Sequence, residues 1–497
     1  MLVPLYYLGL RAFSIDLPSI ANLLVRPRTL MLLSNTFKLS LGVMALTTLI
    51  ALPLAWLFSY SQLRHHRWLL LLCVMPLAIP GYVMAYAILG LSGQFGFFAQ
   101  MFGTPLARIN GYWGAVLALS LYTFPYLLLN LRATFLGYDH SQDEAARSLG
   151  RSGLSIFLRL KLPHLLPAFL AGQLVIVLYT IGDFGAVALM RYEAFSYAIF
   201  TSSFDRTYAA WLSLVLISIT VFLLLGEYLL LRNRFFAKVG SGLSKEPPLV
   251  TLGWAMIPAA TFVALVLLAA IGLPLLIIFY WLGLSPPEWS QLMMVPKTFW
   301  QSAQAAVPAA ALAALFALPV AYLSVRYPSW HSQLLERLSY IGYTLPPLTL
   351  ALAMVFFSIR TPFYQSLFIL ILTWAMAGMA LAIGPIRTSL LQSRINIEEA
   401  SHALGHSNFT TFVRVVLPNI RRSILAGFAL VLVLCMKELP IATLLAPSGY
   451  HTLAVRVFTF TVEGQLAEAA PYALAIILFS SMFIGLILAH EDKSSTR

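Results

Sequence analysis

The stretch "EAARSLGRSGLSIFLRLKLP", residues 144–163, is a polar segment in a chain that is otherwise strongly apolar. It carries four Lys or Arg residues, one carboxylate and three hydroxyl groups. A second stretch, "EASHALGHSNFTTFVRVVLP" at 399–418, aligns with it at a constant offset of 255 residues, and nine of the twenty aligned positions are identical. Because the offset is about half the chain length, the pair indicates two homologous halves.

The composition places the chain in a membrane. Of its 497 residues, 60% are hydrophobic and only 10% are charged, and the mean hydropathy is +0.85. Soluble domains contain about 25% charged residues, so this chain cannot cover a water-facing surface. Apolar runs of roughly 20 residues recur, which is the length of a helix that crosses the hydrocarbon core. The sequence therefore predicts an all-α polytopic membrane protein whose partners include membrane lipid.

These runs predict eleven full spans. They lie at 38–60, 68–90, 111–133, 166–190, 207–231, 254–283, 300–325, 338–358, 364–384, 423–446 and 470–490. The basic segment between 232 and 250 is rich in Gly, Ser and Pro, which is typical of a linker. We expect a first repeat at 1–235, a cytoplasmic linker at 236–252, a second repeat at 253–490 and a cytoplasmic tail at 491–497.

The two halves differ at their first helix. The second half opens with a complete span ending in "LPLLIIFYWLGL" (273–284), whereas "MLVPLYYLGLRAF" (1–13) resembles only the tail of that helix. About a dozen residues cannot cross a bilayer. We therefore expect two six-helix repeats with a truncated first helix. The preferred explanation is a true start upstream of Met1, and the alternative is a genuine stub.

Positive charge fixes the expected orientation. The net charge is +13, but no basic stripe with interleaved aromatic residues stands clear of the apolar runs, so we expect no nucleic-acid partner. When the 60–68 loop is placed in the cytoplasm, 20 of the 31 Lys and Arg residues fall in cytoplasmic loops, at the cytoplasmic edge of a span or in the tail. By the positive-inside rule, both polar stretches and the C-terminus face the cytoplasm.

Each polar stretch predicts two short helices. The first ends at Gly150 or Gly405, as expected of a glycine that follows a helix C-terminus. Ser152 and Ser407 are placed to cap the second helix. We expect Pro163 and Pro418 to end that helix before the next span begins. Amphipathic helices can also simply lie on lipid headgroups, but that alternative does not require the same spacing in both halves.

The pattern E-A-A-x-x-x-G, with a Leu-Pro pair at its end, resembles the EAA loop of binding-protein-dependent ABC importer permeases. The first copy matches fully, and the second departs only at Ser401. The resemblance implies the type I (MetI-like) permease fold, fused from two repeats, in which this loop is the coupling helix that seats in a cleft of a cytosolic ATPase. It implies these coupling residues: Glu144, Ala145, Ala146, Gly150, Pro163, Glu399, Ala400, Gly405 and Pro418.

The resemblance also implies partners. These are two copies of a cytosolic ABC ATPase, which bind the ATP, and a periplasmic or lipid-anchored substrate-binding protein. The sequence has no G-x-x-x-x-G-K-[ST], H-E-x-x-H or G-x-S-x-G motif and no CxxC set. We therefore expect a transport subunit with no catalytic residue, cofactor or bound metal of its own. The adjacent His65 and His66 do not share a helix face, so we interpret them as loop residues.

Three further segments resemble fused iron(III) importer permeases in particular: "GDFGAVALM" (182–190), "MKELPIATLLAP" (436–447) and "TLAVRVFTFTVEGQLAEAA" (452–470). Fused thiamine permeases are the nearest alternative, and sulfate, polyamine or phosphonate permeases are more distant ones. A secondary transporter driven by an ion gradient is a rival from another class. A membrane-embedded enzyme is a further rival, but the chain offers no convergent catalytic set.

Asp183 and the pair Lys437–Glu438 fall late in apolar runs, where a charge is costly. Asp183 and Glu438 are repeat equivalents at the offset of 255, so we expect them to face each other across a pseudo-two-fold axis. One hypothesis places them in the translocation path or at its gate, where paired carboxylates suit a cation such as Fe(III). The alternative, which we favour, is a role in helix packing. The prolines in 75–85 and 343–353 predict kinks or broken helices.

Overall fold

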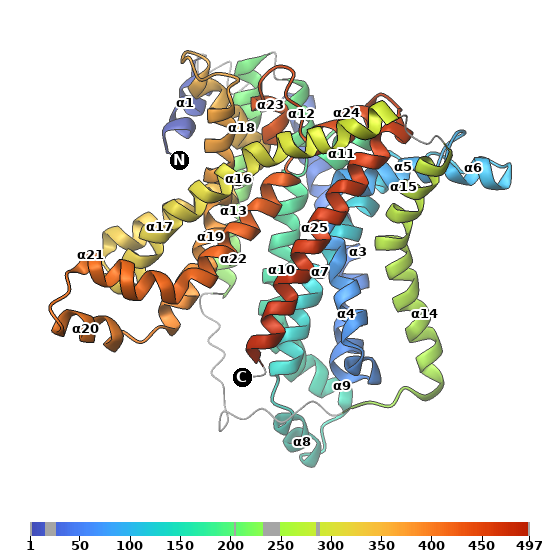
Figure 1. The fold of residues 1–497 in the computed structure, drawn as a ribbon. Helices are drawn as coiled ribbons and strands as arrows, with labels where there is room; N and C mark the ends of the chain where they lie inside the picture. Colours follow the sequence, from blue (N-terminus) through green and yellow to red (C-terminus); the bar gives the residue numbers. More distant parts are fainter. Residues whose placement is uncertain (1, 15–25, 203–204, 232–248, 285–288, 496–497) are drawn as a thin grey trace. The chain divides into compact units, whose positions relative to one another are not determined.

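The computed structural model describes residues 2–14, 26–202, 205–231, 249–284 and 289–495 (Figure 1). Within these residues the regular structure is helical, apart from two isolated β-bridges that join Ser61 to Val250 and Gly93 to Leu106. A helix satisfies all its backbone hydrogen bonds internally, as a segment in lipid must. The predicted all-α membrane fold is confirmed.

Nine helical stretches of the described residues are long and apolar enough to cross a membrane. Their main helices are α3 (Pro27–Tyr60), α7 (Gly111–Gly137), α10 (Leu162–Gly182), α13 (Arg206–Leu231), α14 with α15 (Met256–Leu267 and Leu273–Leu284), α16 (Trp289–Arg326), α19 (Leu367–Gln392), α22 (Leu417–Met436) and α25 (Leu466–Ser495). Two bent pairs bring the number to eleven when each pair is counted as one span, which agrees with the eleven runs expected from the sequence.

The bent pairs occupy the two spans with internal prolines. In the first half, a stretch formed by α4 (Arg67–Val74) and a 3-10 turn meets α5 (Gly81–Leu91) at 94°. In the second half, α17 (Trp330–Thr344) meets α18 (Pro347–Ser358) at 104°. Pro80 and Pro346 stand at the breaks, where a proline supplies no backbone N–H to continue the helix. Of the two predicted possibilities, the helices are broken rather than gently kinked.

Two predicted spans end earlier than expected. The run at 166–190 is divided into α10, which ends at Gly182, and a separate short helix α11 (Gly185–Leu189). The run at 423–446 is likewise divided into α22, which ends at Met436, and α23 (Pro440–Leu445). Apolar composition alone could not reveal these breaks, because the residues on both sides are equally apolar. Helices α12 (Phe195–Thr201) and α24 (Leu453–Val462) follow the two short helices.

The chain forms two compact units that do not coincide with its two halves. Of the described residues, unit 1 contains 2–14, 202, 205–214 and 289–495, and unit 2 contains 26–201, 215–231 and 249–284. The helix α1 (Leu2–Ala12), from the start of the first half, packs on α18 in unit 1. The helix α15, from the start of the second half, packs on α5 in unit 2. Unit 1 therefore contains α1 and the start of α13 from the first half, and unit 2 contains α14 and α15 from the second half. The predicted repeat boundaries are not tested by this division, and most of the predicted linker lies outside the described residues.

Small residues let the central helices of each unit approach closely. In unit 2, an added Cβ at Gly172 of α10 would lie 2.9 Å from the side chain of Leu127 on α7. In unit 1, the repeat equivalent Gly427 of α22 would place a Cβ 3.0 Å from the backbone of Ala382 on α19. Membrane helices associate largely through such close packing. The repeated Ala-Gly pair of the sequence therefore marks the same helix crossing in both units.

Candidate functional site

The two polar stretches fold alike. The first forms α8 (Ser141–Ser148) and α9 (Gly153–Ile156), which lie beyond one end of α7 and α10 in Figure 1. The second forms α20 (Asn396–Ala403) and α21 (Asn408–Thr411) in unit 1. We call them the first loop (141–163) and the second loop (396–418). The predicted helix, glycine turn and second helix are present in both.

A glycine ends the first helix of each loop in the way the sequence predicts. Gly150 has φ +75° and Gly405 has φ +83°, in the left-handed region that favours glycine. The N–H of Gly150 donates to the carbonyl of Arg147, and the next N–H donates to the carbonyl of Ala146. Gly405 and the residue after it make the equivalent pair of bonds. This is the Schellman arrangement, in which the last carbonyls of a helix are satisfied.

The predicted caps of the second helix are also present. The Oγ atom of Ser152 accepts from the N–H of Ser155 at 3.3 Å, and Ser407 accepts from the N–H of Thr410 at 3.3 Å. Such caps satisfy N–H groups that the first helical turn leaves unpaired. The hydroxyls therefore fix the direction in which each chain leaves its glycine turn.

The prediction that Pro163 and Pro418 end the second helix is wrong. The backbone passes through a π-helical turn, at Phe157–Lys161 in the first loop and at Phe412–Val416 in the second, and continues into α10 or α22. A proline clashes with the carbonyl four residues before it, and a turn with i→i+5 spacing relieves that clash. Each loop is therefore joined to its membrane helix without a break.

The predicted coupling residues lie on the surface of the two loops. Six of them are exposed in the first helices and glycine turns, namely Glu144, Ala145, Gly150, Glu399, Ala400 and Gly405, and Pro418 is exposed as well. Ala146 and Pro163 are half-buried. Most of the predicted coupling residues of each loop are therefore accessible to solvent.

Two leucines belong to the same surfaces, and sequence reasoning did not assign them to the site. Leu149 is 81% exposed and its repeat equivalent Leu404 is 80% exposed, each directly before the glycine of its loop. Phe409, on α21 of the second loop, is 77% exposed. Their identity in both repeats was visible in the sequence, but helical periodicity assigns a repeated leucine to a core. An apolar tip surrounded by polar residues is typical of a surface that binds another protein.

Sequence reasoning also missed a buried acid in each loop. Asp143 and Glu398 stand directly before Glu144 and Glu399, at the offset of 255, and are only 6% and 7% exposed. In the first loop, Oδ2 of Asp143 lies 2.8 Å from Nζ of Lys161, and Oδ1 accepts from the hydroxyl of Tyr138 at 2.7 Å. A buried carboxylate requires such partners. A signal was available, since both copies place an acid at this position.

The second loop satisfies its buried acid from a different helix. Oε1 of Glu398 lies 2.7 Å from Nε of Arg326, the last residue of α16, and Oε2 accepts from the hydroxyl of Tyr322 at 3.2 Å. Arg326 also donates to the backbone carbonyl of Ser393, at 3.2 Å. The side chains of Arg326 and Glu398 are each 9% exposed.

The charges of the first loop shift its titrating groups. Burial by itself would raise the pKa of Asp143, but hydrogen bonds from Lys161 and Tyr138 and the nearby positive charge hold this pKa below its ordinary value. Burial, together with the charge of Lys161, lowers the pKa of His140. The Nδ1 atom of His140 lies 3.6 Å from Oδ2 of Asp143, and its buried Nε2 makes no hydrogen bond within the described residues. His140 is therefore held neutral against an ionised Asp143.

Asp183 and Glu438 each cap a short helix. Asp183 directly follows α10, and its Oδ1 accepts from the N–H groups of Ala186 and Val187 at 2.8 and 3.4 Å, while Tyr122 donates to Oδ2 at 3.4 Å. The Asp183 carbonyl accepts from the hydroxyl of Ser196 at 2.6 Å. Asp183 therefore caps the first turn of α11 and stabilises the break that divides the predicted span.

Glu438 does the same at the other break. Its carboxylate accepts from the N–H of Ile441 at 3.0 Å and from the N–H of Ala442 at 3.2 Å, and Trp374 donates its indole N–H at 3.0 Å. The side chain of Glu438 therefore caps the first turn of α23. Asp183 belongs to unit 2 and Glu438 to unit 1, and the expectation that they face each other stays a prediction.

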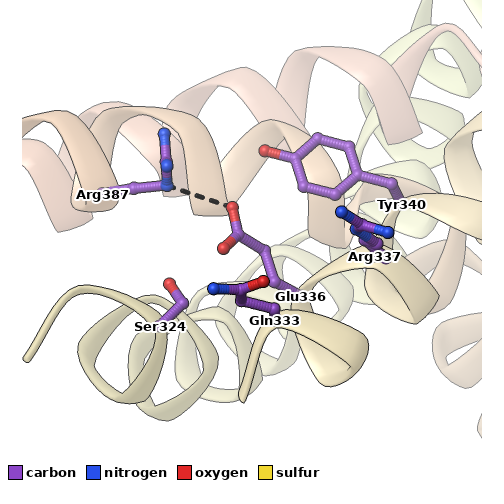
Figure 2. A pocket seen from close by; sticks show the side chains of 6 residues that line it. All are labelled: Ser324, Gln333, Glu336, Arg337, Tyr340 and Arg387. Atoms are coloured by element: carbon purple, nitrogen blue, oxygen red, sulfur yellow. Dashed lines mark ion pairs between the residues drawn. The ribbon is translucent and has the colours of Figure 1, made fainter. Parts of the chain in front are cut away.

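A polar hollow lies near the second loop in unit 1, between the end of α16, α17 and α19 (Figure 2). Its volume is about 310 Å³, and it is lined by Ser324, Gln333, Glu336, Arg337, Tyr340 and Arg387. Glu336 and Arg387 point toward each other, with Nε 3.1 Å from Oε1. In the first half, the apolar residues Leu70, Leu71 and Val74 stand at the positions aligned with Glu336, Arg337 and Tyr340, so this polar lining is not repeated at those positions. In the described part of the chain, no group of three or more His, Cys, Asp or Glu residues is arranged to hold a metal ion.

Comparison with known proteins identifies the family to which these features belong. The sequence pattern of the family described as "Binding-protein-dependent transport system inner membrane component" matches residues 48–232 and again 314–490. The Fe(3+)-transport system permease protein FbpB 2 of Haemophilus influenzae is 30% identical, over 99% of this chain and 96% of its own length. The sulfate transport system permease protein CysW of Escherichia coli is 29% identical, over 38% of this chain and 66% of its own length. A probable molybdenum ABC transporter permease protein of Haloferax volcanii is 33% identical over 30% of this chain and 55% of its own length.

Proposed function

Since this chain belongs to the family of binding-protein-dependent transport system inner membrane components, we propose that it is the fused permease of an ABC importer for iron(III). Two copies of a cytosolic ATPase bind the two loops from the cytoplasm, and the ATP is bound by those partners. A periplasmic or lipid-anchored binding protein delivers the iron(III) on the opposite side of the inner membrane. The chain itself contributes the path and no catalytic residue.

The observation that carries this proposal is the pair of matching surfaces on the two loops. Each surface presents an exposed glutamate and a leucine that is about four-fifths exposed, and the short helix that carries them ends at a glycine. An exposed leucine costs free energy in water, and an ATPase that covers it recovers that free energy. Because the pattern occurs once in each repeat, two equivalent partners fit the chain.

The helical connections explain how such a partner drives transport. The first loop continues through its π turn into α10, and the second continues into α22. When an ATP-bound ATPase dimer closes, a displacement of the two loops is passed on to those two membrane helices. The coupling then needs only rigid connections between a docking surface and a membrane helix, and neither loop has to unfold.

Iron(III) as the substrate rests on the length of the match. The iron permease of Haemophilus influenzae aligns over almost the whole of this chain and has nearly the same length. The sulfate and molybdenum permeases align over 38% and 30% of it. Full-length similarity includes both repeats and the segments near Asp183 and Glu438. Thiamine, sulfate, polyamine and phosphonate are the alternatives that a transport assay separates from iron(III).

The decisive experiment tests partner and substrate together. The chain is purified in detergent from cells that carry its neighbouring genes, and co-purified proteins are examined for a P-loop ATPase. The double variant Glu144→Ala/Glu399→Ala is expected to lose that ATPase, and the control Glu463→Ala, at an exposed carboxylate outside both loops, is expected to retain it. Vesicles containing the complex should then take up radioactive iron(III) with ATP and binding protein. Uptake without the ATPase would refute the importer, and uptake of thiamine alone would refute the substrate.

A further inference from the structure

Asp143 and Glu398 occupy the same place in the two loops but are held in different ways. Each is buried while the glutamate that follows it is exposed, and each is bound by one cation and one tyrosine hydroxyl. In the first loop the cation is Lys161, in the π turn that leads into α10. In the second loop it is Arg326, at the end of α16.

The repeat shows that the cation has changed its position between the two halves. Lys161 aligns with Val416 at the offset of 255, and Val416 is buried and uncharged. Arg326 aligns with Tyr60 at the offset of 266 that relates "ALPLAW" (51–56) to "ALPVAY" (317–322). In the first loop, Nζ of Lys161 lies 5.7 Å from the centre of the Tyr60 ring. Each unit thus places one cation beside its buried acid. In the first loop this cation is in the π turn, and in the second it is at the end of the helix α16.

Burial makes these pairs important for the orientation of the loops. A buried acid without its cation is strongly unfavourable, so the helix that carries it is held where the cation can reach. Asp143 and Glu398 lie in the first turn of α8 and α20, one residue before the exposed glutamate. The ion pair therefore fixes the direction of each helix. It thereby also fixes the positions of Glu144 and Leu149 in the first loop and of Glu399 and Leu404 in the second.

We propose that Asp143 and Glu398 are positioning residues that orient the two ATPase-docking surfaces, the first by binding Lys161 at the base of α10 and the second by binding Arg326 at the end of α16. This inference rests on the proposed function, because it assumes that an ATPase docks on the loops. The two docking surfaces are then attached to different membrane helices. A displacement of the first loop reaches α10 through both the chain and the ion pair, whereas a displacement of the second reaches α22 through the chain and α16 through the ion pair.

The test measures binding-protein-stimulated ATP hydrolysis while the co-purified ATPase is titrated against the chain in nanodiscs. Asp143→Asn and Glu398→Gln keep the size of each side chain and remove its charge. Each is expected to raise the ATPase concentration for half-maximal stimulation by about tenfold, on the scale of coupling between linked sites, with the maximal rate restored at saturation. The conservative variants Asp143→Glu and Glu398→Asp, which exchange the acids of the two repeats, keep the charge that pairs with the cation and are expected to keep half-saturation within about twofold of the parent.

Variants of the two cations provide an independent test of the same proposal. Lys161→Met and Arg326→Met should reproduce the shift in half-saturation, and Arg422→Gln, at an exposed arginine of α22, should leave it unchanged. Size-exclusion chromatography and thermal unfolding report the fold of each variant. Where an acid variant fails to fold, the double variant of the same pair, Asp143→Asn/Lys161→Met or Glu398→Gln/Arg326→Met, replaces it, because removal of both charges leaves no buried ion unpaired. If the folded variants show parental half-saturation, the positioning role is overturned. If the parent itself shows no saturable stimulation, the proposed function fails instead.

Discussion

Arg326 binds Glu398 with its Nε atom 2.7 Å from Oε1, and this contact joins the end of α16 to the first turn of α20. Both side chains are almost completely buried. Their partner Tyr322 lies one turn earlier on α16 and donates to the other carboxylate oxygen. A loop that approaches water on one side is therefore held on its other side by a desolvated ion pair, which is far less sensitive to salt than a surface pair.

Removal of the tyrosine donor should weaken this attachment measurably. We expect Tyr322→Phe to lower the free energy of unfolding by about 1 kcal/mol, because a buried carboxylate oxygen loses its hydrogen bond. Thermal unfolding of the purified chain measures the effect. The matched control Tyr327→Phe, at a ring that is 54% exposed, should change it little. Equal losses in both variants would show that the bond to Glu398 adds no stability.

His140 should make the first loop sensitive to pH. Its pKa is lowered from 6.5, so the unfolded chain binds a proton more readily than the folded one, and stability falls as pH drops below 6.5 toward the folded pKa. The groups facing it are Lys161, Asp143 and Asp139. His140→Asn should reduce that decline in melting temperature, and His331→Asn, at an exposed histidine, should not. Part of the decline should remain, because burial also lowers the pKa of His451.

The contribution of Asp143 lies in a separate pH range. Its pKa is lowered below 3.8, so its contribution is complete above that value and is lost as pH falls through the folded pKa. A decline between pH 6.5 and 3.8 that is as large in His140→Asn as in the parent would contradict the assignment to His140.

The exposed leucines should affect docking and leave the fold intact. Leu149→Ser and Leu404→Ser change side chains that are 81% and 80% exposed, so the melting temperature should remain that of the parent. A leucine that becomes buried on binding is worth about 1.5–3 kcal/mol, so half-saturation by the ATPase should rise by at least about tenfold. Phe95→Ser, at a ring that is 78% exposed between α5 and α6 (Phe97–Phe102), serves as the control for the loss of an exposed apolar group. An unchanged half-saturation would place the ATPase elsewhere.

The cap of α23 gives a prediction for Glu438. Glu438→Ala removes the acceptor for two backbone N–H groups and should lower stability by about 1–2 kcal/mol, whereas Glu438→Gln keeps an acceptor oxygen and should cost less. Because the role is structural, iron uptake by both variants should equal that of the parent when it is measured on vesicles with equal amounts of folded protein. A stable Glu438→Gln variant without uptake would instead assign the carboxylate to the translocation path.

The crossing of α19 and α22 should be intolerant of a methyl group. At Gly427 an added Cβ would lie 3.0 Å from the Cα and the carbonyl oxygen of Ala382, and this backbone cannot move aside cheaply. Gly427→Ala is expected to lower stability by about 1–3 kcal/mol. Gly384→Ala, on α19 with nothing within 4 Å of its added Cβ, should be neutral or slightly stabilising. Equal stability of the two variants would show that the helices are more loosely packed than described.

The sequence predicted the features that depend on composition and on local capping. The number of spans, the left-handed glycines Gly150 and Gly405 and the caps at Ser152 and Ser407 follow from hydropathy and from short-range chemistry. It could not predict the continuous helices at Pro163 and Pro418, because a π turn before each proline removes the clash that ordinarily ends a helix.

Long-range partners account for the other misses. Asp143 and Glu398 are neighbours of the motif in sequence, but their burial depends on Lys161 and on Arg326, the latter 72 residues away from its acid. The repeat could not indicate these pairs either, because the cation stands at different aligned positions in the two halves. The breaks after Gly182 and Met436 were not predicted, because apolar runs continue across them. Asp183 and Glu438, which the sequence placed as charges within a span, cap the short helices that follow these breaks.

The exchange of α1 and α15 between the halves determines the order in which the molecule can be completed during synthesis. Helix α1 leaves the ribosome long before α18, the helix on which it packs, which begins only at Pro347. At ~5–20 residues per second, α1 waits for some tens of seconds in the membrane before its neighbour exists. Unit 2 likewise lacks α15 until the second half has begun. Each unit must therefore enter the bilayer incomplete. Because the chain is fused, the later helices α18 and α15 stay close to α1 and α5, on which they pack.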